Sequence, residues 1–253
     1  MQISKIPVVA LEQLQNNVFL LKARSKELAE KSSPGQFFNI KVSDSYFPLL
    51  RRPFSISNVE NDILTFMFDI HGEGTKLLSL KKEGDNIDLI GPLGNGFNLD
   101  DDFDTAVIVA GGLGSAPFPL LLNKLSKEKK VKSFVGGRSK PNVITWKLAN
   151  VNIATDDGSI GFHGNVFQLI KKHENIFTEN KCKVFACGPN PMLKALQEYC
   201  LANNINCELS TECAMACGFG ICQGCPIESS DKKSPYKLVC KDGPVFNAKD
   251  ILI

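Results

Sequence analysis

Four cysteines near the carboxyl end have a spacing suited to holding iron. Cys217, Cys222, Cys225 and Cys240 follow the pattern C-x4-C-x2-C with one distant cysteine. In plant-type [2Fe–2S] sites, three thiolates wrap the cluster within one loop and a fourth ligand comes from elsewhere. The glycines between them suit such a loop, because residues without a Cβ let backbone N–H groups turn toward the sulfurs. The sequence therefore predicts a [2Fe–2S] cluster held by these four residues.

Two other interpretations of the cysteines stay open at this point. A structural zinc ion is usually held by two C-x2-C knuckles, and Cys222 with Cys225 forms one such knuckle. Reduced thiols without a role are the second alternative. The gap between Cys213 and Cys217 matches neither the iron nor the zinc pattern, so we do not include Cys213 in the predicted ligand set.

Two glycine-containing turns follow apolar runs and could bind a dinucleotide. They comprise Gly111, Gly112 and Gly114 in the first turn, and Cys187, Gly188 and Pro189 in the second. At the carboxyl edge of a parallel sheet, phosphates meet free N–H groups and the positive end of a helix. Each turn alone could be an ordinary tight connection, and Cys187 a buried small hydrophobe. Two such turns in one predicted sheet favour a nucleotide site.

The amino-terminal part carries a second candidate phosphate site. Arg52 begins a predicted strand with a guanidinium suited to bidentate phosphate contact, and Ser55 offers a hydroxyl three residues later. A solvated basic pair at the start of the strand is the alternative interpretation. Gly74 and Thr75 lie at the start of a short predicted helix and offer a second phosphate cradle.

Two kinds of secondary structure must position these residues. Short β segments bounded by Gly, Pro, Asn or Asp predict a small antiparallel barrel, with strands over Gln36–Val42, Phe54–Asn58, Ile63–Ile70 and Asn86–Ile90 and a helix over Thr75–Lys81. After residue 105, apolar strands alternate with helices, which predicts a doubly wound, mostly parallel sheet. Its predicted strands are 105–110, Val131–Gly136, Val151–Thr155, Cys182–Ala186 and Asn206–Leu209, and its predicted helices are Pro117–Lys130, Val166–His173 and Pro191–Asn203.

The chain is long enough for two domains and a short appendage. We expect a barrel domain over residues 1–100, an α/β domain over residues 101–210 and a cluster-binding segment over residues 211–253. The last segment is too short to build a core without a metal or another staple.

Charge and terminal composition narrow the function classes. With 29 basic and 27 acidic side chains, the net charge is +2, so nucleic acid and anionic lipid have no electrostatic reason to bind. The first residues lack a signal-peptide core, and no apolar run is long enough for a membrane span. We therefore expect a cytoplasmic protein, whose clustered thiols stay reduced and available for metal.

The motifs together resemble a known family. Arg52-Pro-Phe-Ser55, Gly72-Glu-Gly-Thr75, Gly111-Gly-Leu-Gly114 and Cys187-Gly-Pro189 occur in the order of the ferredoxin–NADP reductase superfamily. More narrowly, the runs 155–159, 215–218 and 239–246 resemble the electron-transfer subunits of class B dihydroorotate dehydrogenases. The resemblance covers essentially the whole chain.

The resemblance implies an FAD-binding barrel, an NAD-binding domain and a [2Fe–2S] segment. It places FAD against Arg52, Pro53, Phe54, Ser55, Phe68, Asp69, Gly74 and Thr75, and NAD against Gly111, Gly112, Gly114, Cys187, Gly188 and Pro189. It also implies an FMN-bearing catalytic partner that oxidises dihydroorotate, in a heterotetramer with two copies of each subunit. Two features depart from the family pattern, namely the acid Asp69, where a basic residue is usual, and the extra Cys213.

The implied chemistry joins a two-electron carrier to a one-electron carrier. Electrons from the partner would pass through the cluster and FAD to NAD⁺, with Ser55 and Cys187 as the residues expected to tune hydride transfer. The sequence has no clear cluster of Arg or Lys to bind the 2′-phosphate of NADP, although Arg138 and Lys140 follow a predicted strand. NAD is therefore expected rather than NADP.

Two alternative functions remain open on the sequence. One is a related FAD and [2Fe–2S] subunit that oxidises NAD(P)H in a sulfide dehydrogenase, a bifurcating transhydrogenase or a hydrogenase. The other is a zinc-stabilised regulatory module that binds nucleotide without redox chemistry, which would be colourless.

Overall fold

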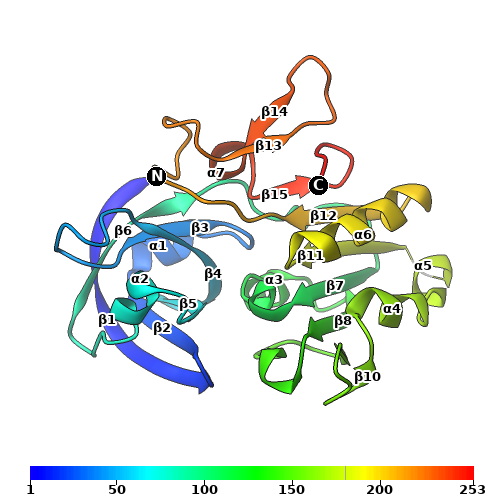
Figure 1. The fold of residues 1–253 in the computed structure, drawn as a ribbon, viewed down its shortest axis with the longest axis horizontal. Coiled ribbons are helices and arrows are strands. Elements are labelled where there is room, and N and C mark those ends of the chain that lie inside the picture. The colour runs from blue at the N-terminus through cyan, green and yellow to red at the C-terminus, as the bar shows by residue number, and fades with distance from the viewer. Residues whose placement is uncertain (180) are drawn as a thin grey trace.

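The structure, a computed structural model, describes residues 1–179 and 181–253 and consists of a barrel, an α/β domain and a carboxyl-terminal segment that touches both (Figure 1). The barrel is closed and antiparallel, with strand order β1-β2-β5-β4-β3-β6. Its strands are β1 (Gln2–Gln15), β2 (Val18–Arg24), β3 (Phe37–Lys41), β4 (Arg52–Glu60), β5 (Ile63–Asp69) and β6 (Asn86–Leu93). The predicted antiparallel barrel is confirmed.

Two short helices accompany the barrel, α1 (Lys26–Lys31) and α2 (Glu73–Leu78). The sequence interpretation missed α1, which begins after Ser25, whose hydroxyl accepts a hydrogen bond from the Leu28 N–H at 3.3 Å. Helix α2 begins two residues before the predicted start at Thr75. The Thr75 hydroxyl accepts hydrogen bonds from the N–H groups of His71 and Gly72, which fixes the turn that leads into this helix.

The second domain is a seven-stranded sheet of order β10-β9-β8-β7-β11-β12-β15, parallel except at the β12–β15 pair. Its strands are β7 (Thr105–Gly111), β8 (Lys130–Gly137), β9 (Val151–Thr155), β10 (Phe162–His163), β11 (Cys182–Cys187), β12 (Asn206–Ser210) and β15 (Val245–Asn247). Its helices are the 3-10 turns η1 (Gly112–Ser115) and η2 (Lys140–Asn142), with α3 (Phe118–Lys124), α4 (Val166–Lys171), α5 (Asn175–Glu179) and α6 (Asn190–Ala202).

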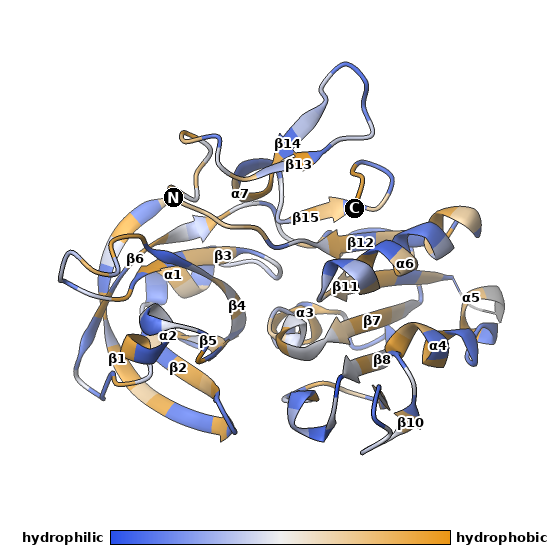
Figure 2. Ribbon diagram, in the orientation of Figure 1, coloured by the Kyte–Doolittle hydropathy of each residue, from blue (hydrophilic) through white to orange (hydrophobic). Residues whose placement is uncertain are grey.

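The sheet buries both of its faces, as its continuous apolar strands predict. Along β7, Ile108 packs with α3 on one face, whereas Val107 and Val109 pack with α4 and α6 on the other. Figure 2 shows hydrophobic stretches along the strands of both domains. The predicted helix over Pro117–Lys130 is too long, because α3 ends at Lys124, Leu125 adopts an extended conformation, and β8 already begins at Lys130.

The carboxyl-terminal segment packs against both the barrel and the sheet. It contains the hairpin β13 (Pro226–Glu228) and β14 (Tyr236–Leu238) and the short helix α7 (Val239–Asp242), and then returns to the sheet as β15. Cys225 and Cys240 pack in one apolar cluster with Phe37, Ile90 and Leu93 of the barrel. The cysteine loop therefore lies directly on the barrel surface.

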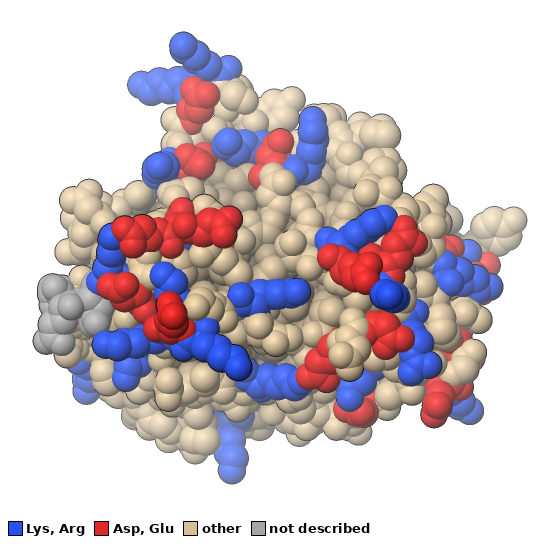
Figure 3. Space-filling view, turned by 180° about the vertical axis from the view of Figure 1, so that it is seen from behind, with Lys and Arg blue, Asp and Glu red and all other residues tan. Residues whose placement is uncertain are grey.

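Two surface properties agree with the composition. None of the helices in the described ranges combines the length and the apolar character that a bilayer span requires. On the face seen in Figure 3, Lys and Arg are interspersed with Asp and Glu. That face offers no extended basic surface to nucleic acid.

Candidate functional site

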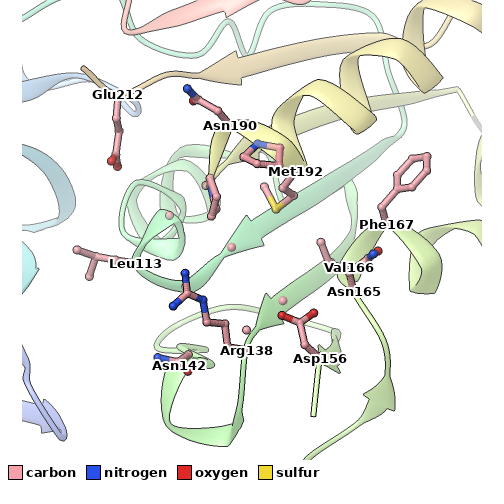
Figure 4. Close-up of a pocket in the computed structure, with 18 of the residues that line it drawn as sticks. Leu113, Arg138, Asn142, Asp156, Asn165, Val166, Phe167, Asn190, Met192 and Glu212 are labelled. Atoms are coloured by element: carbon pink, nitrogen blue, oxygen red, sulfur yellow. The ribbon is translucent and has the colours of Figure 1, made fainter. Parts of the chain in front are cut away.

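The larger of two adjoining cavities lies at the carboxyl edge of the sheet and has a volume of about 920 Å³ (Figure 4). Five of the six residues predicted to bind the nucleotide line it, namely Gly111, Gly112, Gly114, Gly188 and Pro189. The turns after β7 and β11 approach closely, because a Cβ on Gly111 would lie 2.7 Å from Cδ of Pro189. The structure thus brings together two turns that are far apart in the sequence.

Polar side chains at the far end of this cavity suit a ribose. Arg138 follows β8 and Asp156 follows β9, and both point into the cavity in Figure 4. In doubly wound folds, a carboxylate in this region accepts a hydrogen bond from the ribose 2′-hydroxyl of NAD, whereas an Arg accommodates the 2′-phosphate of NADP. Sequence reasoning named Arg138 and the run 155–159 but assigned no binding role to Asp156.

The smaller cavity, of about 250 Å³, lies between the barrel and the sheet. It is lined by Arg52, Pro53, Phe54, Ser55, Phe68, Asp69 and Thr75 of the barrel and by Cys187 of the sheet. Gly74 lies behind this wall, where an added Cβ would lie 3.4 Å from Nε of Arg52. Residues predicted for flavin and for nicotinamide therefore meet in one place.

The donor set of the smaller cavity fits a flavin nucleotide. Arg51 is already held by Asp88, whose backbone oxygen and Oδ1 accept hydrogen bonds at 2.9 and 2.8 Å. Arg52 lines the cavity and donates to the Leu50 carbonyl at 2.8 Å, which leaves other guanidinium N–H groups for phosphate. Aromatic and apolar side chains make up much of the remaining wall, as a planar ring system requires.

An acidic pair that sequence reasoning did not identify lies where the two cavities adjoin. Asp69 and Glu212 line both cavities. Part of the Glu212 side chain faces open space, but the protein around it and then the charge of Asp69 raise the pKa of this carboxyl above 4.5. Burial and then the Glu212 charge also raise the pKa of the Cys187 thiol, which therefore stays protonated at neutral pH.

The four predicted ligands lie in two pairs. Sγ of Cys225 is 3.1 Å from Sγ of Cys240, and both residues are buried. The Cys222 N–H donates to Sγ of Cys217 at 3.5 Å. In the described residues, no three Cys, His, Asp or Glu side chains gather around one metal ion. Two pairs suit two irons, each with two protein ligands, better than a single tetrahedral zinc ion.

The cysteine loop favours a thiolate at Cys217, whereas burial and then the neighbouring Cys225 raise the pKa of Cys240 to about 12. Burial acts against ionisation of Cys217, but the N–H groups of Cys222, Phe219 and Ile221 outweigh it and lower the pKa of this thiol to about 6. Gly218 and Gly220 have φ values of 82° and 89°, the left-handed conformation that the loop needs to turn these N–H groups inward. The residues therefore fit a negatively charged iron–sulfur cluster.

Cys213 is not one of the four predicted ligands, but its thiol contacts that of Cys225. It lines the smaller cavity and packs in the same apolar cluster as Cys225. Burial and then the neighbouring Cys225 raise the pKa of its thiol to about 11, the behaviour of a buried protonated thiol. Its place between the cavity and the cluster loop could not be read from the spacing.

Comparison with known proteins agrees with this geometry. Residues 212–252 match the family described as the iron-sulfur cluster binding domain of dihydroorotate dehydrogenase B. The chain is 36% identical to the dihydroorotate dehydrogenase B (NAD(+)) electron transfer subunit of Bacillus pumilus, over 98% of this chain and 97% of the relative. The chain belongs to this family of electron transfer subunits. The corresponding subunit of Caldanaerobacter subterraneus is 40% identical, over 88% of each chain.

Solved structures support the fold. A structure of the NADH-dependent reduced ferredoxin-NADP oxidoreductase, reported in connection with flavin-based electron bifurcation, superposes with a TM-score of 0.84 and 25% identity, over 98% of this chain and 89% of that one. A ferredoxin NADP+ reductase from Neisseria gonorrhoeae with bound FAD and NADP superposes with a TM-score of 0.65 at 16% identity, over 80% of this chain and 92% of that one. The second likeness shows the fold alone.

Proposed function

We propose that this chain is the electron transfer subunit of an NAD-dependent dihydroorotate dehydrogenase, working in the cytoplasm with FAD in the smaller cavity and a [2Fe–2S] cluster on the cysteine pairs. One observation carries the proposal. The smaller cavity shares Asp69, Leu113 and Glu212 with the nucleotide cavity, and it shares Phe37, Cys213 and Met215 with the apolar cluster around Cys225 and Cys240. A group bound there therefore contacts both neighbouring sites.

The bound flavin supplies the step that exchanges a hydride for single electrons. The protein supplies binding and placement. Arg52 and the first turn of α2, which includes Thr75, hold phosphate. Ser55 and the Cys187 thiol lie on the barrel and sheet walls of the ring site. Arg138 and Asp156 line the nucleotide cavity, and the relatives' name, dihydroorotate dehydrogenase B (NAD(+)), favours NAD over NADP. The N–H groups of the loop stabilise the Cys217 thiolate.

A catalytic partner is part of this proposal. Relatives bear the name of an electron transfer subunit, so the oxidation of dihydroorotate belongs to another chain. We propose that this partner carries FMN and that two copies of each subunit assemble. Cys222 is the exposed member of the four ligands, which leaves this side of the loop open to a partner.

The test begins with protein purified without oxygen. We expect about two irons, two acid-labile sulfides and one FAD per chain, NADH-dependent dye reduction by the chain alone, and dihydroorotate-dependent NAD⁺ reduction once the catalytic subunit is added. A colourless protein with bound zinc would overturn the proposal and favour the regulatory module instead.

A second electron-transfer function is favoured by the 0.84 TM-score to the NADH-dependent reduced ferredoxin-NADP oxidoreductase. In that case the chain would oxidise NADH in a bifurcating complex. Reconstitution separates the two functions, because a chain of that kind would not pass electrons from a dihydroorotate-oxidising subunit to NAD⁺.

A further inference from the structure

Asn39, on barrel strand β3, makes an unusual contact with the cysteine loop. Its side chain is fully buried, and Nδ2 donates a hydrogen bond to the backbone oxygen of Cys217 at 3.0 Å. Within the described residues, Oδ1 of this amide has no hydrogen-bond partner. A buried amide with one unpaired group contributes little to the stability of the fold. The hydrogen bond to Cys217 is therefore better explained by the group that it positions.

Strand register places Asn39 between the flavin cavity and the cluster segment. On one side it lies opposite Pro53 of β4, which lines the cavity. On the other side it lies opposite Ile90 of β6, which packs with Cys225 and Cys240. Directly opposed residues on antiparallel strands point to the same face of the sheet. The amide therefore stands midway along a row that joins the two cofactor sites.

Phe37 forms a parallel row two residues earlier on the same strand. It lies opposite Ser55 on β4 and lines the smaller, flavin-binding cavity. It also packs among the apolar side chains around Cys225. Alternation along a strand puts Phe37 and Asn39 on the same face. Phe37 is an apolar spacer, whereas Asn39 adds a directed hydrogen bond to the loop.

The Asn39 side chain also interlocks with Gly218, the residue after Cys217. A Cβ on Gly218 would lie 2.0 Å from Nδ2 of Asn39, and Gly218 has φ of 82°. The amide thus occupies the space beside this glycine while it holds the preceding carbonyl. Together these contacts fix the Cys217–Gly218 peptide, from which the loop turns its N–H groups toward the Cys217 sulfur.

We propose that Asn39 is a positioning residue that ties the first cluster ligand to the flavin-binding strands and so sets the placement of the cluster relative to the flavin cavity. The inference rests on the proposed function in one respect, namely that Cys217 binds iron. Electron transfer over a protein gap depends steeply on distance, so a barrel residue that fixes this gap affects transfer without touching either cofactor's reacting atoms.

The test compares holoprotein with Asn39→Ala, Asn39→Asp and Asn58→Ala. Asn58 is a matched control, because it is buried in the same barrel but contacts Glu60 and Asn123 rather than the cysteine loop. In both Asn39 variants we expect full FAD content, iron release to a ferrous chelator about tenfold faster than in the wild type, and an altered electron paramagnetic resonance spectrum of the reduced cluster. Wild-type release and spectrum in these variants would overturn the inference.

A double variant tests the interlock separately. Gly218→Ala should also accelerate iron release. Release from the double variant, Asn39→Ala with Gly218→Ala, should be slower than the product of the two single effects predicts, because the smaller side chain at position 39 leaves room for the new Cβ. If Asn39→Asp does not accumulate as folded protein, the comparison of the two single variants with the double variant tests the inference. Iron-release effects that multiply fully in the double variant contradict it. Wild-type protein without iron and sulfide would instead defeat the proposed function.

Discussion

Gly114 lies against the backbone of Cys187, so that a Cβ on Gly114 would be 2.3 Å from the Cys187 carbonyl oxygen and 2.6 Å from its carbonyl carbon. The contact joins the glycine turn after β7 to the turn after β11. Because the obstacle is backbone and not a flexible side chain, a larger residue at 114 must push the two turns apart. The nucleotide cavity and the Cys187 wall of the flavin cavity therefore share one closely packed junction.

The first prediction follows from this junction. Gly114→Ala should raise the KM for NADH in dye reduction by about tenfold, which corresponds to about 1.4 kcal/mol of binding free energy. Gly72→Ala is the control, because nothing lies within 4 Å of a Cβ at that position. Steady-state kinetics at fixed dye concentration measure both. Equal KM values for wild type and Gly114→Ala would show that the turns can separate without loss of binding.

Much of this junction followed from sequence patterns. The apolar strands β7 and β11 and their glycine turns were predicted, because parallel strands covered on both faces have continuous apolar sequences. The cysteine spacing was equally informative, since ligand geometry constrains it. Strands β1 and β2 are not among the predicted elements. Pro7 lies within β1, where it ends the pairing with β6, and Val8 begins the pairing with β2.

The residues that join the sites were not predictable in the same way. Asn39 stands between Phe38 and Ile40, and the pattern alone does not show that the cysteine loop covers this polar residue. Glu212 lies after the last recognisable periodicity, and its environment arises from Asp69, a residue far away in the sequence. Both depend on where the carboxyl-terminal segment docks.

The second prediction concerns pH. Partial desolvation by the surrounding protein and then the charge of Asp69 raise the pKa of Glu212, so the native state holds this proton at pH values where the unfolded chain has already released it. Between pH 4.5, the ordinary pKa, and the raised value, this group therefore lowers stability as pH rises. Glu212→Gln should remove that loss, so its melting temperature should gain on the wild type as pH rises from 4 to about 7.

Two variants check the assignment to Glu212. Asp69→Asn should lower the pKa of Glu212 and weaken the same pH-dependent loss, because it removes the neighbouring negative charge. Glu198→Gln, on an exposed position of α6, should track the wild type. Glu208 has a raised pKa as well, caused mainly by burial, but it is present in all variants and cancels in the differences. If the melting temperatures of Glu212→Gln and the wild type change with pH by the same amount, the prediction is contradicted.

The third prediction concerns Lys183, which binds the segment that connects β6 of the barrel to β7 of the sheet. Lys183 is fully buried, and Nζ contacts Oε1 of Glu208 at 3.1 Å, the backbone oxygen of Asn98 at 2.7 Å, and the Asp101 carboxylate. Lys183→Met would leave buried acid without its cation and should lower the free energy of unfolding by about 3 kcal/mol in urea titrations. The exposed pair of Lys181 with Asp102 is the control, and Lys181→Met should lower the free energy of unfolding much less than Lys183→Met does. Similar losses for both variants would show that the buried position is not decisive.

The last prediction separates cluster ligation from flavin binding. Cys222 is exposed, so Cys222→Ala removes a ligand with little disturbance of the core. This variant should lose its iron and acid-labile sulfide, and with them electron exchange with the catalytic partner. FAD and NADH-dependent dye reduction should remain, because none of the flavin cavity's lining residues is changed. Cys213→Ser is the matched control in the same segment. It should keep full iron, because Cys213 is not one of the four predicted ligands and Ser keeps a group that can hydrogen-bond to Cys225. Loss of iron in Cys213→Ser would place this fifth thiol among the ligands, and loss of FAD in Cys222→Ala would mean that the flavin site depends on an intact cluster loop.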